Sequence, residues 1–318
     1  MGQLPPARCN PNPAFINTGV DFAGPFILKK WLGRCKQTYK AYIAVFVCFA
    51  TSATHLEVVN GLSTEEFIAA YRRFTSLRGV CKNLYSDCGT NFVGAIKELQ
   101  SLESQANYMC DFAHQLSLEV TNWHLNPPGA PHQGRKWEAG VKSMKHHLSR
   151  IMGATLYTYH QLDTLVKQIS AQLNSRPLCP MTNDPNDLEA LTPGHFLIGR
   201  AMTAIPEGQL IDINDGKLSR WQLIQKHSQQ LWNQWSNDYI KQFHVRTKWC
   251  TSDNSIQLNS MVIMMDERVP PTKWPLARVI QLHPGDDGLV RVVTIKTCTS
   301  TFKRPISKLC LLPVSPDE

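Results

Sequence analysis

Residues 82–92 read Lys-Asn-Leu-Tyr-Ser-Asp-Cys-Gly-Thr-Asn-Phe, a stretch that predicts a short strand, a tight turn and the start of a helix. Asp87 ends the strand, and Thr90 is placed to cap the helix. Because open α/β sheets place their sites at the carboxyl ends of strands, the stretch predicts an α/β fold with a polar site at Asp87. The alternative is that Asp87 only forms an Asx-turn before Gly89.

Two more carboxylates stand in similar settings. Asp21 lies between Val20 and Phe22 in an apolar strand, where an unpaired buried charge would cost several kcal/mol. Glu138 opens a helical run over residues 136–152. Asp21 has the alternative of capping local backbone amides, and Glu138 that of a first-turn carboxylate on the helix dipole.

Three acids carried by two strands and one helix are able to converge on one point. Mg²⁺ and Mn²⁺ prefer oxygen ligands, so such a trio with a substrate phosphate makes a plausible first shell. Two such ions about 3.5–4 Å apart hold the attacking and leaving oxygens of a phosphoryl displacement. The hypothesis is a two-metal centre at Asp21, Asp87 and Glu138.

The segments around these acids alternate between strand and helix patterns. Ser63 and Glu66 stand in capping-box register at the start of a helix that ends at Gly79. Strands are expected at 15–23, 39–50, 54–59 and 120–124, and further helices at 91–103, 136–152 and 160–174.

The second half of the chain has a different pattern. Residues 177–220, rich in Pro, Asn, Asp and Gly, predict an irregular connector, and a long helix is expected over 219–243. We interpret its aromatic residues as packing residues, with base stacking as the alternative; they are Trp221, Trp232, Trp235 and Tyr239. Strands expected at 261–264, 274–282, 290–295 and 300–306 predict a small all-β barrel.

Composition limits the class of protein. With 318 residues, 42% of them hydrophobic, the chain is able to bury one large core and a second small one. Its ten cysteines include no Cys-x-x-Cys pair, which indicates reduced intracellular thiols. The apolar run over residues 41–50 is too short for a membrane span, so we expect no membrane association. The net charge of +8 favours an anionic partner.

The positive charge is concentrated around Glu138. Residues 129–176 contain seven Lys or Arg against two acids. On the predicted helix one face carries Arg135, Glu138, Lys142, Lys145 and Ser149, and Val141, Met144, Leu148 and Met152 face the core. The adjacent His146 and His147 point to diverging faces, which argues against a histidine metal pair.

Three motifs together resemble a known family: Gly-Val-Asp-Phe-Ala-Gly-Pro at 19–25, Tyr-Ser-Asp-Cys-Gly-Thr-Asn-Phe-Val-Gly-Ala at 85–95, and Pro-His-Gln-Gly-Arg-Lys-Trp-Glu-Ala-Gly-Val-Lys at 131–142. They resemble the integrase core of BEL/Pao-type retrotransposons, of the DDE superfamily, over most of the chain. The resemblance implies that Asp21, Asp87 and Glu138 are catalytic and bind two Mg²⁺ or Mn²⁺ ions.

The resemblance also implies a substrate and an organisation. The enzyme would insert element DNA into host DNA by 3′-end processing and strand transfer, as a homo-oligomer in the nucleus, with no small-molecule substrate. DNA contacts are expected from His132, Gln133, Arg135, Lys136, Lys142 and Lys145. In the barrel, an accessory DNA-binding module, they are expected from Lys273, Arg278, Arg291, Lys303 and Arg304. The alternative is a cationic surface in which Glu138 and Lys142 form an i, i+4 pair.

The expected domains are a linker remnant (1–14), a ribonuclease-H-like catalytic core (15–180), a connector with a long helix (181–255) and the small β-barrel (256–318). About twenty residues precede Asp21, and their single cysteine, Cys9, cannot form the N-terminal zinc module that such integrases carry. We therefore expect a fragment or truncated frame. The alternatives to an active integrase are an inactive integrase-derived DNA-binding or interaction protein, and a metal nuclease that cleaves without joining.

Overall fold

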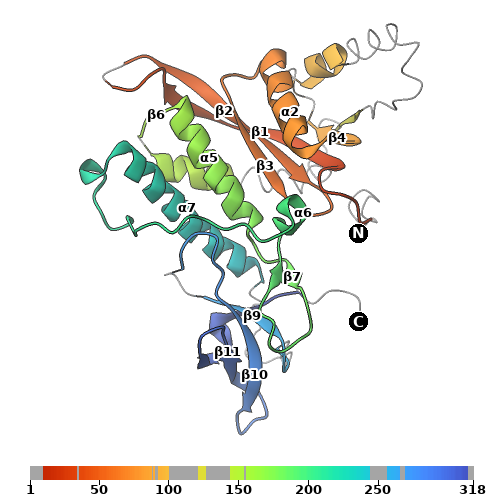
Figure 1. Cartoon of the computed structure of the whole chain (residues 1–318), viewed down its shortest axis with the longest axis vertical. Helices are drawn as coiled ribbons and strands as arrows, with labels where there is room; N and C mark the ends of the chain where they lie inside the picture. Colours follow the sequence, from red (N-terminus) through yellow and green to blue (C-terminus); the bar gives the residue numbers. More distant parts are fainter. Residues whose placement is uncertain are drawn as a thin grey trace. The chain divides into compact units, whose positions relative to one another are not determined.

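The computed structural model describes residues 10–33, 36–87, 89, 92–99, 121–126, 144–153, 155–243, 256–265 and 269–313 (Figure 1). The chain forms a mixed α/β structure of two compact units, Met1–Ser170 and Ala171–Glu318. The boundaries of the four domains expected from the sequence stay predictions. Among the described residues, no helix has the length and apolar character needed to cross a membrane.

The first unit is built on a six-stranded sheet with the order β3-β2-β1-β4-β5, and β6 pairs with β1 beside this path. The strand β1 is antiparallel to β2 and parallel to β4 and β6. β3 is antiparallel to β2, and β5 is parallel to β4. The strands are β1 (Asn17–Lys29), β2 (Thr38–Cys48), β3 (Thr54–Val59), β4 (Asn83–Ser86), β5 (Asn122–Leu125) and β6 (Tyr157–Thr158).

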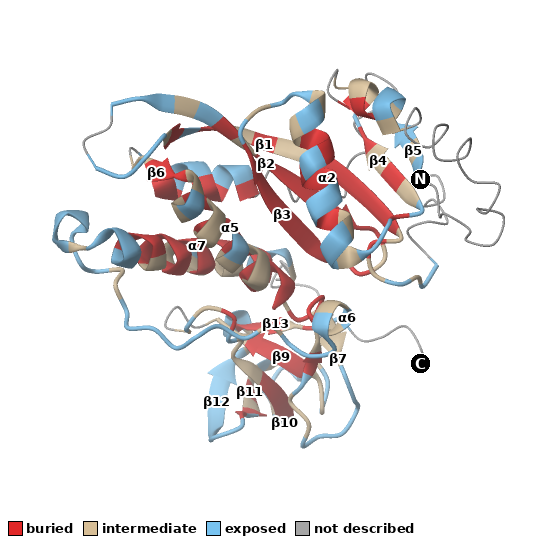
Figure 2. Cartoon of the chain, turned by 45° about the horizontal axis from the view of Figure 1, so that its top comes forward, coloured by how far each residue is buried: buried red, intermediate tan, exposed pale blue. Residues whose placement is uncertain are grey.

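The apolar sequence of β2 accounts for its position in the core, and β3 contributes Leu56, Val58 and Val59 beside three buried polar residues. All six residues of β3 are buried, as are the last six residues of β2 (Figure 2). The strand predicted at 54–59 is confirmed. The prediction that the first strand stops at residue 23 is wrong, because β1 continues to Lys29. A register shift between Ala23 and Phe26 accommodates Pro25, which has no N–H to donate to the ladder.

Two helices of the first unit begin and end close to where the sequence predicts. In α2 (Thr64–Arg78), the Ser63 hydroxyl accepts the N–H of Glu66, and Gly79 ends the helix with φ at 85°. Apolar residues of α2 face the sheet, including Phe67 and Phe74. The helix α5 (Tyr159–Asn174) matches the prediction for 160–174. Residues 92–99 and 144–152 are also helical. Thr90 lies outside the described residues.

The second unit contains a five-stranded antiparallel sheet with the order β12-β11-β10-β9-β13 and the long helix α7 (Arg220–Phe243). Its core consists of Val262, Ala277, Val279, Val293, Ile295 and Leu309. The strands are β9 (Met261–Met264), β10 (Leu276–Pro284), β11 (Val290–Lys296), β12 (Thr301–Pro305) and β13 (Leu309–Leu311). Closure of this sheet into a barrel stays a prediction.

Small elements interrupt the predicted connector. They are the two-stranded pair β7 (Cys179–Pro180) and β8 (Ala190–Leu191), the single turn α6 (His195–Ile198) and the 3-10 turn η2 (Asp215–Lys217). A second 3-10 turn, η3 (Ile306–Lys308), comes directly before β13. The connector is therefore irregular over most of its length, as its Pro, Asn, Asp and Gly content predicts.

Candidate functional site

The sheet pairs the strand that contains Asp21 with the strand that Asp87 directly follows. Asp21 lies within β1 and is paired across the sheet with Val45 of β2. On the other side, β1 runs parallel to β4, and the last pair in the register joins Gly19 to Tyr85. Two residues further along the chain are Asp21, still within β1, and Asp87, the first residue after β4. Because side chains alternate with a period of two, Asp21 lies on the same face of the sheet as the paired Gly19 and Tyr85.

The chain around Asp21 is apolar and tightly held. Its neighbours Val20 and Ala23 are fully buried, while Asp21 itself is only partly buried. The Oδ1 atom of Asp21 accepts the N–H of Phe22 at 2.7 Å. The adjacent ring of Phe22 stacks on Phe92, with 5.4 Å between the ring centroids. The local backbone bond that the sequence offered as an alternative is therefore present, and it engages one of the two carboxylate oxygens.

Asp87 sits in the turn that follows β4. Its Oδ1 atom accepts the N–H of Gly89 at 3.2 Å, which is the Asx-turn anticipated from the sequence. The side chain is exposed, and the helical residues 92–99 begin just beyond this turn. An Asx-turn uses one carboxylate oxygen, so it is compatible with a ligand on the other.

Two residues that sequence reasoning did not single out, Ser86 and Trp123, support the position of Asp87 through hydrogen bonds. The fully buried Ser86 donates its hydroxyl to the carbonyl oxygen of Asp87 at 3.0 Å. The same hydroxyl accepts the indole N–H of Trp123, from β5, at 2.9 Å. Trp123 also packs on Phe67 of α2, with ring centroids 5.3 Å apart. The sequence signal that could have identified this support was the tryptophan in the short strand predicted at 120–124.

The remaining predicted metal ligand and five of the six DNA contacts predicted around it lie outside the described residues. They are Glu138, His132, Gln133, Arg135, Lys136 and Lys142. Within the described residues, no three His, Cys, Asp or Glu side chains form a cluster able to hold a metal ion. The predicted three-carboxylate centre therefore stays a prediction, with Asp21 on β1 and Asp87 in the turn after the neighbouring strand β4.

The described end of the Glu138 helix has the predicted faces. Met144, Leu148 and Met152 are buried, and Lys145 is exposed. The two histidines diverge, because His147 is 5% exposed and His146 lies at the surface. The prediction that they do not form a metal pair is consistent with these opposite positions. A role for Lys145 in DNA contact stays a prediction.

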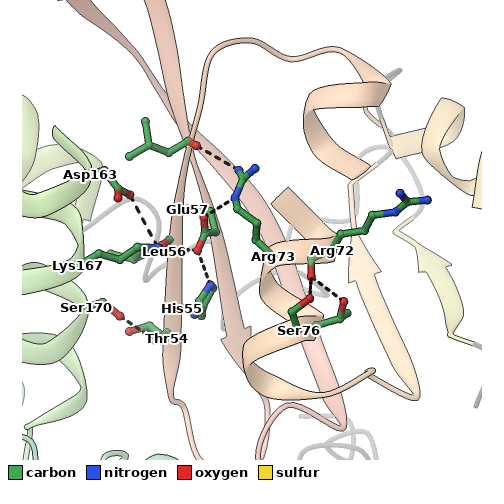
Figure 3. A network of polar contacts seen from close by, with 12 residues as sticks. Thr54, His55, Leu56, Glu57, Arg72, Arg73, Ser76, Asp163, Lys167 and Ser170 are labelled. Atoms are coloured by element: carbon green, nitrogen blue, oxygen red, sulfur yellow. Dashed lines mark hydrogen bonds and ion pairs between the residues drawn. The ribbon is translucent and has the colours of Figure 1, made fainter. Parts of the chain in front are cut away.

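A second group of ionisable residues surrounds Glu57, which lies on β3 and is only 4% exposed (Figure 3). Its Oε1 atom lies 2.6 Å from Nζ of Lys167 and 2.9 Å from Nε2 of His55. Its Oε2 atom accepts the Nε–H of Arg73 at 2.9 Å. Lys167 also donates to the carbonyl oxygen of Leu56 at 2.8 Å. We name His55, Glu57, Arg73 and Lys167 the Glu57 network.

The electrostatics of this network indicate a structural role. Burial raises the pKa of Glu57, but the hydrogen bonds from His55, Lys167 and Arg73 outweigh it and bring the pKa to about 2. Burial lowers the pKa of His55, although its hydrogen bond to Glu57 acts in the opposite direction. Both carboxylate oxygens of Glu57 are engaged by side chains from three elements. The network therefore ties β3 to α2 and α5, with no oxygen turned to a substrate.

The second unit corrects one predicted DNA contact. Arg278 is 2% exposed, and its guanidinium donates to the carbonyl oxygens of Thr182, Asp187 and Asn259 at 2.5, 2.7 and 3.0 Å. It holds the connector against β10 and is not available to DNA, so that prediction is wrong. Arg291 is exposed but forms a two-bond pair with Asp287. Lys273, Lys303 and Arg304 are exposed, and their DNA contacts stay predictions.

The aromatic residues of α7 pack within the second unit. The rings of Trp232 and Trp235 lie 5.0 and 6.0 Å from the ring of Trp274. The buried Tyr239 donates its hydroxyl to the carbonyl oxygen of Pro177 at 2.7 Å. These contacts agree with the packing interpretation for the buried members. Trp221 differs, because it is 52% exposed.

Comparisons with known proteins give limited matches. Residues 219–312 match a family described as a family of unknown function (DUF5641), and this region comprises α7 and the five-stranded sheet. No curated protein matches the chain. Among solved structures, the chain is similar to the simian T-cell lymphotropic virus intasome in complex with PP2A regulatory subunit B56 gamma. The identity is 11%, the coverage is 99% of this chain and 85% of that chain, and the TM-score of 0.39 is too low to carry an argument.

Proposed function

We propose that this chain is an integrase of the BEL/Pao retrotransposon type, which joins element DNA to target DNA by metal-dependent phosphoryl transfer. The observation that carries the proposal is the parallel register of β1 and β4, whose last pair, Gly19 with Tyr85, comes two residues before Asp21 and Asp87 along the chain. The sheet order β3-β2-β1-β4-β5, with β4 and β5 parallel to β1, is the order expected of a ribonuclease-H-like core and supports it.

The side chains of Asp21 and Asp87, which we together name the carboxylate edge, are donor groups that fit divalent cations. Asp21 and Asp87 offer carboxylate oxygens, the hard ligands that Mg²⁺ and Mn²⁺ prefer, and each has one oxygen in a backbone hydrogen bond that fixes the group. Glu138 is proposed as the third ligand. Two cations held there would supply the positive charge that stabilises the attacking and leaving oxygens at phosphorus.

The reaction proposed is two successive displacements at phosphorus. In the first, water attacks a phosphodiester near the end of the element, a P–O bond breaks, and a 3′-hydroxyl is released. In the second, that 3′-oxygen forms a bond to a target-strand phosphorus, and the target's own 3′-oxygen leaves with a proton. Each step exchanges one P–O bond for another, so neither needs an energy source or a covalent protein intermediate.

The proposed partner is DNA, bound by a homo-oligomer in the nucleus. The net charge of +8 is suited to a polyanion. Lys145, exposed on the helical residues 144–152, is proposed to contact phosphate together with the basic residues that precede it along the chain. Contacts of this kind weaken with salt and are largely independent of base sequence.

A strand-transfer assay with the purified chain and duplexes ending in the element's termini tests the proposal. We expect joined products that require Mg²⁺ or Mn²⁺ and disappear in Asp21→Asn and Glu138→Gln. The matched control is Asp163→Asn, which should stay active. Asp163 is a partly buried acid on α5, and its Oδ1 atom lies 3.9 Å from Nζ of Lys167.

Three outcomes would contradict the proposal in distinct ways. DNA retention without any metal-dependent product would indicate an inactive DNA-binding remnant. Cleaved but unjoined products would indicate a metal nuclease. Full activity in Asp21→Asn would remove the carboxylate edge from the chemistry altogether.

A further inference from the structure

The hairpin formed by β1 and β2 extends beyond the neighbouring strand β3. The pairing of β2 with β3 ends at Tyr42 and Val59, whereas β1 and β2 stay paired outward to Lys29 and Thr38. One further bond joins the N–H of Lys30 to the carbonyl oxygen of Gln37 at 3.2 Å. Figure 1 shows this hairpin projecting at the upper left. We name its outer part, residues 26–41, the ribbon.

The two faces of the ribbon differ in character. Residues opposite each other in an antiparallel pair share a face. The pair Phe26 and Ala41 is buried, and on the same face Leu28 is fully buried. The other face carries Ile27 opposite Lys40, both of which are exposed. The inner face anchors the ribbon to the first unit, which leaves the outer face and the tip accessible.

The exposed surface of the ribbon combines lysines with a tryptophan. Residues 26–41 contain no Asp or Glu. Lys30 and Lys36 are exposed near the tip. Trp31 is 61% exposed, and Nζ of Lys30 lies 5.9 Å from the centroid of its ring. Among the described residues these lysines form no ion pair, and apart from the contact with Lys30 the Trp31 indole is largely exposed, so stability explains this surface poorly.

The shape and charge of the ribbon point to one partner. We propose that the ribbon binds double-stranded DNA, with its lysines on the phosphates and Trp31 against a base or sugar. The major groove, about 12 Å wide, admits a two-stranded β-ribbon. β6 pairs with Leu28 and Lys29, so the two-stranded part of the ribbon is the end beyond Lys29, where Lys30 bonds to Gln37. In a duplex groove, apolar side chains contact base edges and sugars, and lysines bind the phosphates. This inference rests on the proposed function for its partner but uses a surface separate from the carboxylate edge.

A membrane surface fits the ribbon less well. Anchoring in a bilayer depends on a large apolar face, whereas the tip of the ribbon offers only Trp31 and Leu32 among its described residues, next to several lysines. A DNA groove is lined by phosphates, which are able to pair with the lysines on both strands of the ribbon. DNA therefore matches the charge of the ribbon better than a membrane does.

Fluorescence anisotropy with a labelled duplex, repeated over a series of NaCl concentrations, tests the lysines. In Lys30→Gln/Lys36→Gln we expect the slope of log affinity against log salt to fall by about 1 to 2, since each phosphate contact contributes roughly 0.9. The matched control is Lys82→Gln/Lys217→Gln, which removes two exposed lysines elsewhere and should keep the wild-type slope. A slope equal to that of the control would overturn the proposal.

Trp31 gives a second, independent measurement. Trp31→Ala should weaken duplex binding by about fivefold or more at constant salt slope, since an apolar aromatic contact contributes to affinity without releasing counterions. Trp31→Phe should restore most of the affinity. Unchanged affinity in Trp31→Ala, with thermal unfolding unaltered, would contradict a role for the indole.

The remaining comparisons separate this proposal from its rivals. Vesicles containing anionic phosphatidylserine are the membrane probe, and loss of vesicle binding with intact duplex binding in the lysine variant would overturn the DNA assignment. If the ribbon variants bind DNA normally while Asp87→Asn abolishes strand transfer, only the ribbon proposal fails. If they lose DNA while the wild-type chain never joins strands, the proposed function fails and the ribbon proposal stands.

Discussion

Glu57 and Asp87, two carboxylates of the first unit, differ in which groups form hydrogen bonds with their oxygens. Glu57 is 4% exposed and has both oxygens engaged by His55, Arg73 and Lys167. Asp87 is exposed at the end of β4 and accepts a backbone N–H on one oxygen. A carboxylate saturated by cations contributes to stability, whereas one held by backbone groups at a strand end is poised for a ligand. The difference separates a structural ion network from a candidate active site.

Asp87→Asn gives the largest expected effect and separates activity from stability. Asn keeps an oxygen to accept the Gly89 N–H, so the Asx-turn survives while the charge is lost. Since second-sphere changes at metal sites already cost about 10–100-fold, we expect strand transfer to fall at least about a hundredfold. The free energy of unfolding should change by less than about 0.5 kcal/mol, as for surface substitutions. Chemical denaturation and strand-transfer rates provide the measurements.

A large loss of stability in Asp87→Asn would contradict this assignment. It would show that the Asp87 charge supports the fold in the way that Glu57 does.

Glu57→Gln should lower stability and leave strand transfer unchanged, the opposite of Asp87→Asn. The change removes the charge that three side chains surround, and the cations Arg73 and Lys167 lose their shared partner. Breaking a buried pair costs about 3–5 kcal/mol, but these two side chains are 43% and 42% exposed and are able to turn to water. We therefore expect a loss of about 2 kcal/mol in urea unfolding, with strand transfer per folded molecule unchanged.

A matched control for Glu57→Gln is Glu65→Gln in the first turn of α2, where the acid is not part of the network. Equal destabilisation in both variants would show that the Glu57 network contributes no more to stability than an exposed acid does.

The local sequence predicts those features whose causes lie within a few residues. Leu56, Val58 and Val59 predict the strand β3, and the bond between the Ser63 hydroxyl and the Glu66 N–H spans three residues of one motif. The strand end at Asp87 is predicted for the same reason, because the strand residues and the turn residues adjoin each other. In each case the pattern that predicts the element is local, although the backbone of β3 is satisfied only by its pairing with β2.

Features that depend on distant partners escaped prediction. Glu57 is joined to Lys167, 110 residues away, and Ser86 is joined to Trp123 across 37 residues. Arg278 has the composition of a DNA contact but is buried against carbonyl oxygens of residues 182 and 187, more than ninety positions earlier. No periodicity or spacing within one segment encodes such pairs, since they depend on how the elements pack.

Acidification should weaken the Glu57 network. The pKa of Glu57 is lowered to about 2 in the folded chain from 4.5, so its contribution is present above pH 4.5 and is lost as the pH falls toward 2. The loss of stability due to His55 begins at a higher pH than that due to Glu57. Burial lowers the pKa of His55 in the folded chain, so the unfolded chain takes up its proton first as the pH falls through about 6.5. Urea unfolding of wild type and Glu57→Gln from pH 7 to pH 3 measures the effect. The difference of about 2 kcal/mol between them should shrink by at least half near the lower limit.

A constant difference across this range would show that Glu57 stabilises the fold through packing and not through its charge.

Ser86→Ala should have the smallest effect and addresses the support of Asp87. The substitution removes a buried hydroxyl that donates to the Asp87 carbonyl and accepts from the Trp123 indole, which leaves the indole N–H without this partner. An unsatisfied buried donor costs about 1–3 kcal/mol, and we expect the lower end because the indole is only partly buried. Strand transfer should fall about tenfold through a displaced Asp87, as for other positioning residues at metal sites.

The matched control for Ser86 is Ser76→Ala, which removes an exposed hydroxyl bonded to the carbonyl of Arg72 within α2. Ser86→Thr keeps the hydroxyl and should recover activity wherever the added methyl group is tolerated. If Ser86→Ala lowers stability by about 1 kcal/mol and leaves the strand-transfer rate of the folded protein intact, the Trp123–Ser86–Asp87 chain belongs with the Glu57 network as a structural device. Loss of rate that Ser86→Thr restores would instead place this chain of hydrogen bonds with the carboxylate edge.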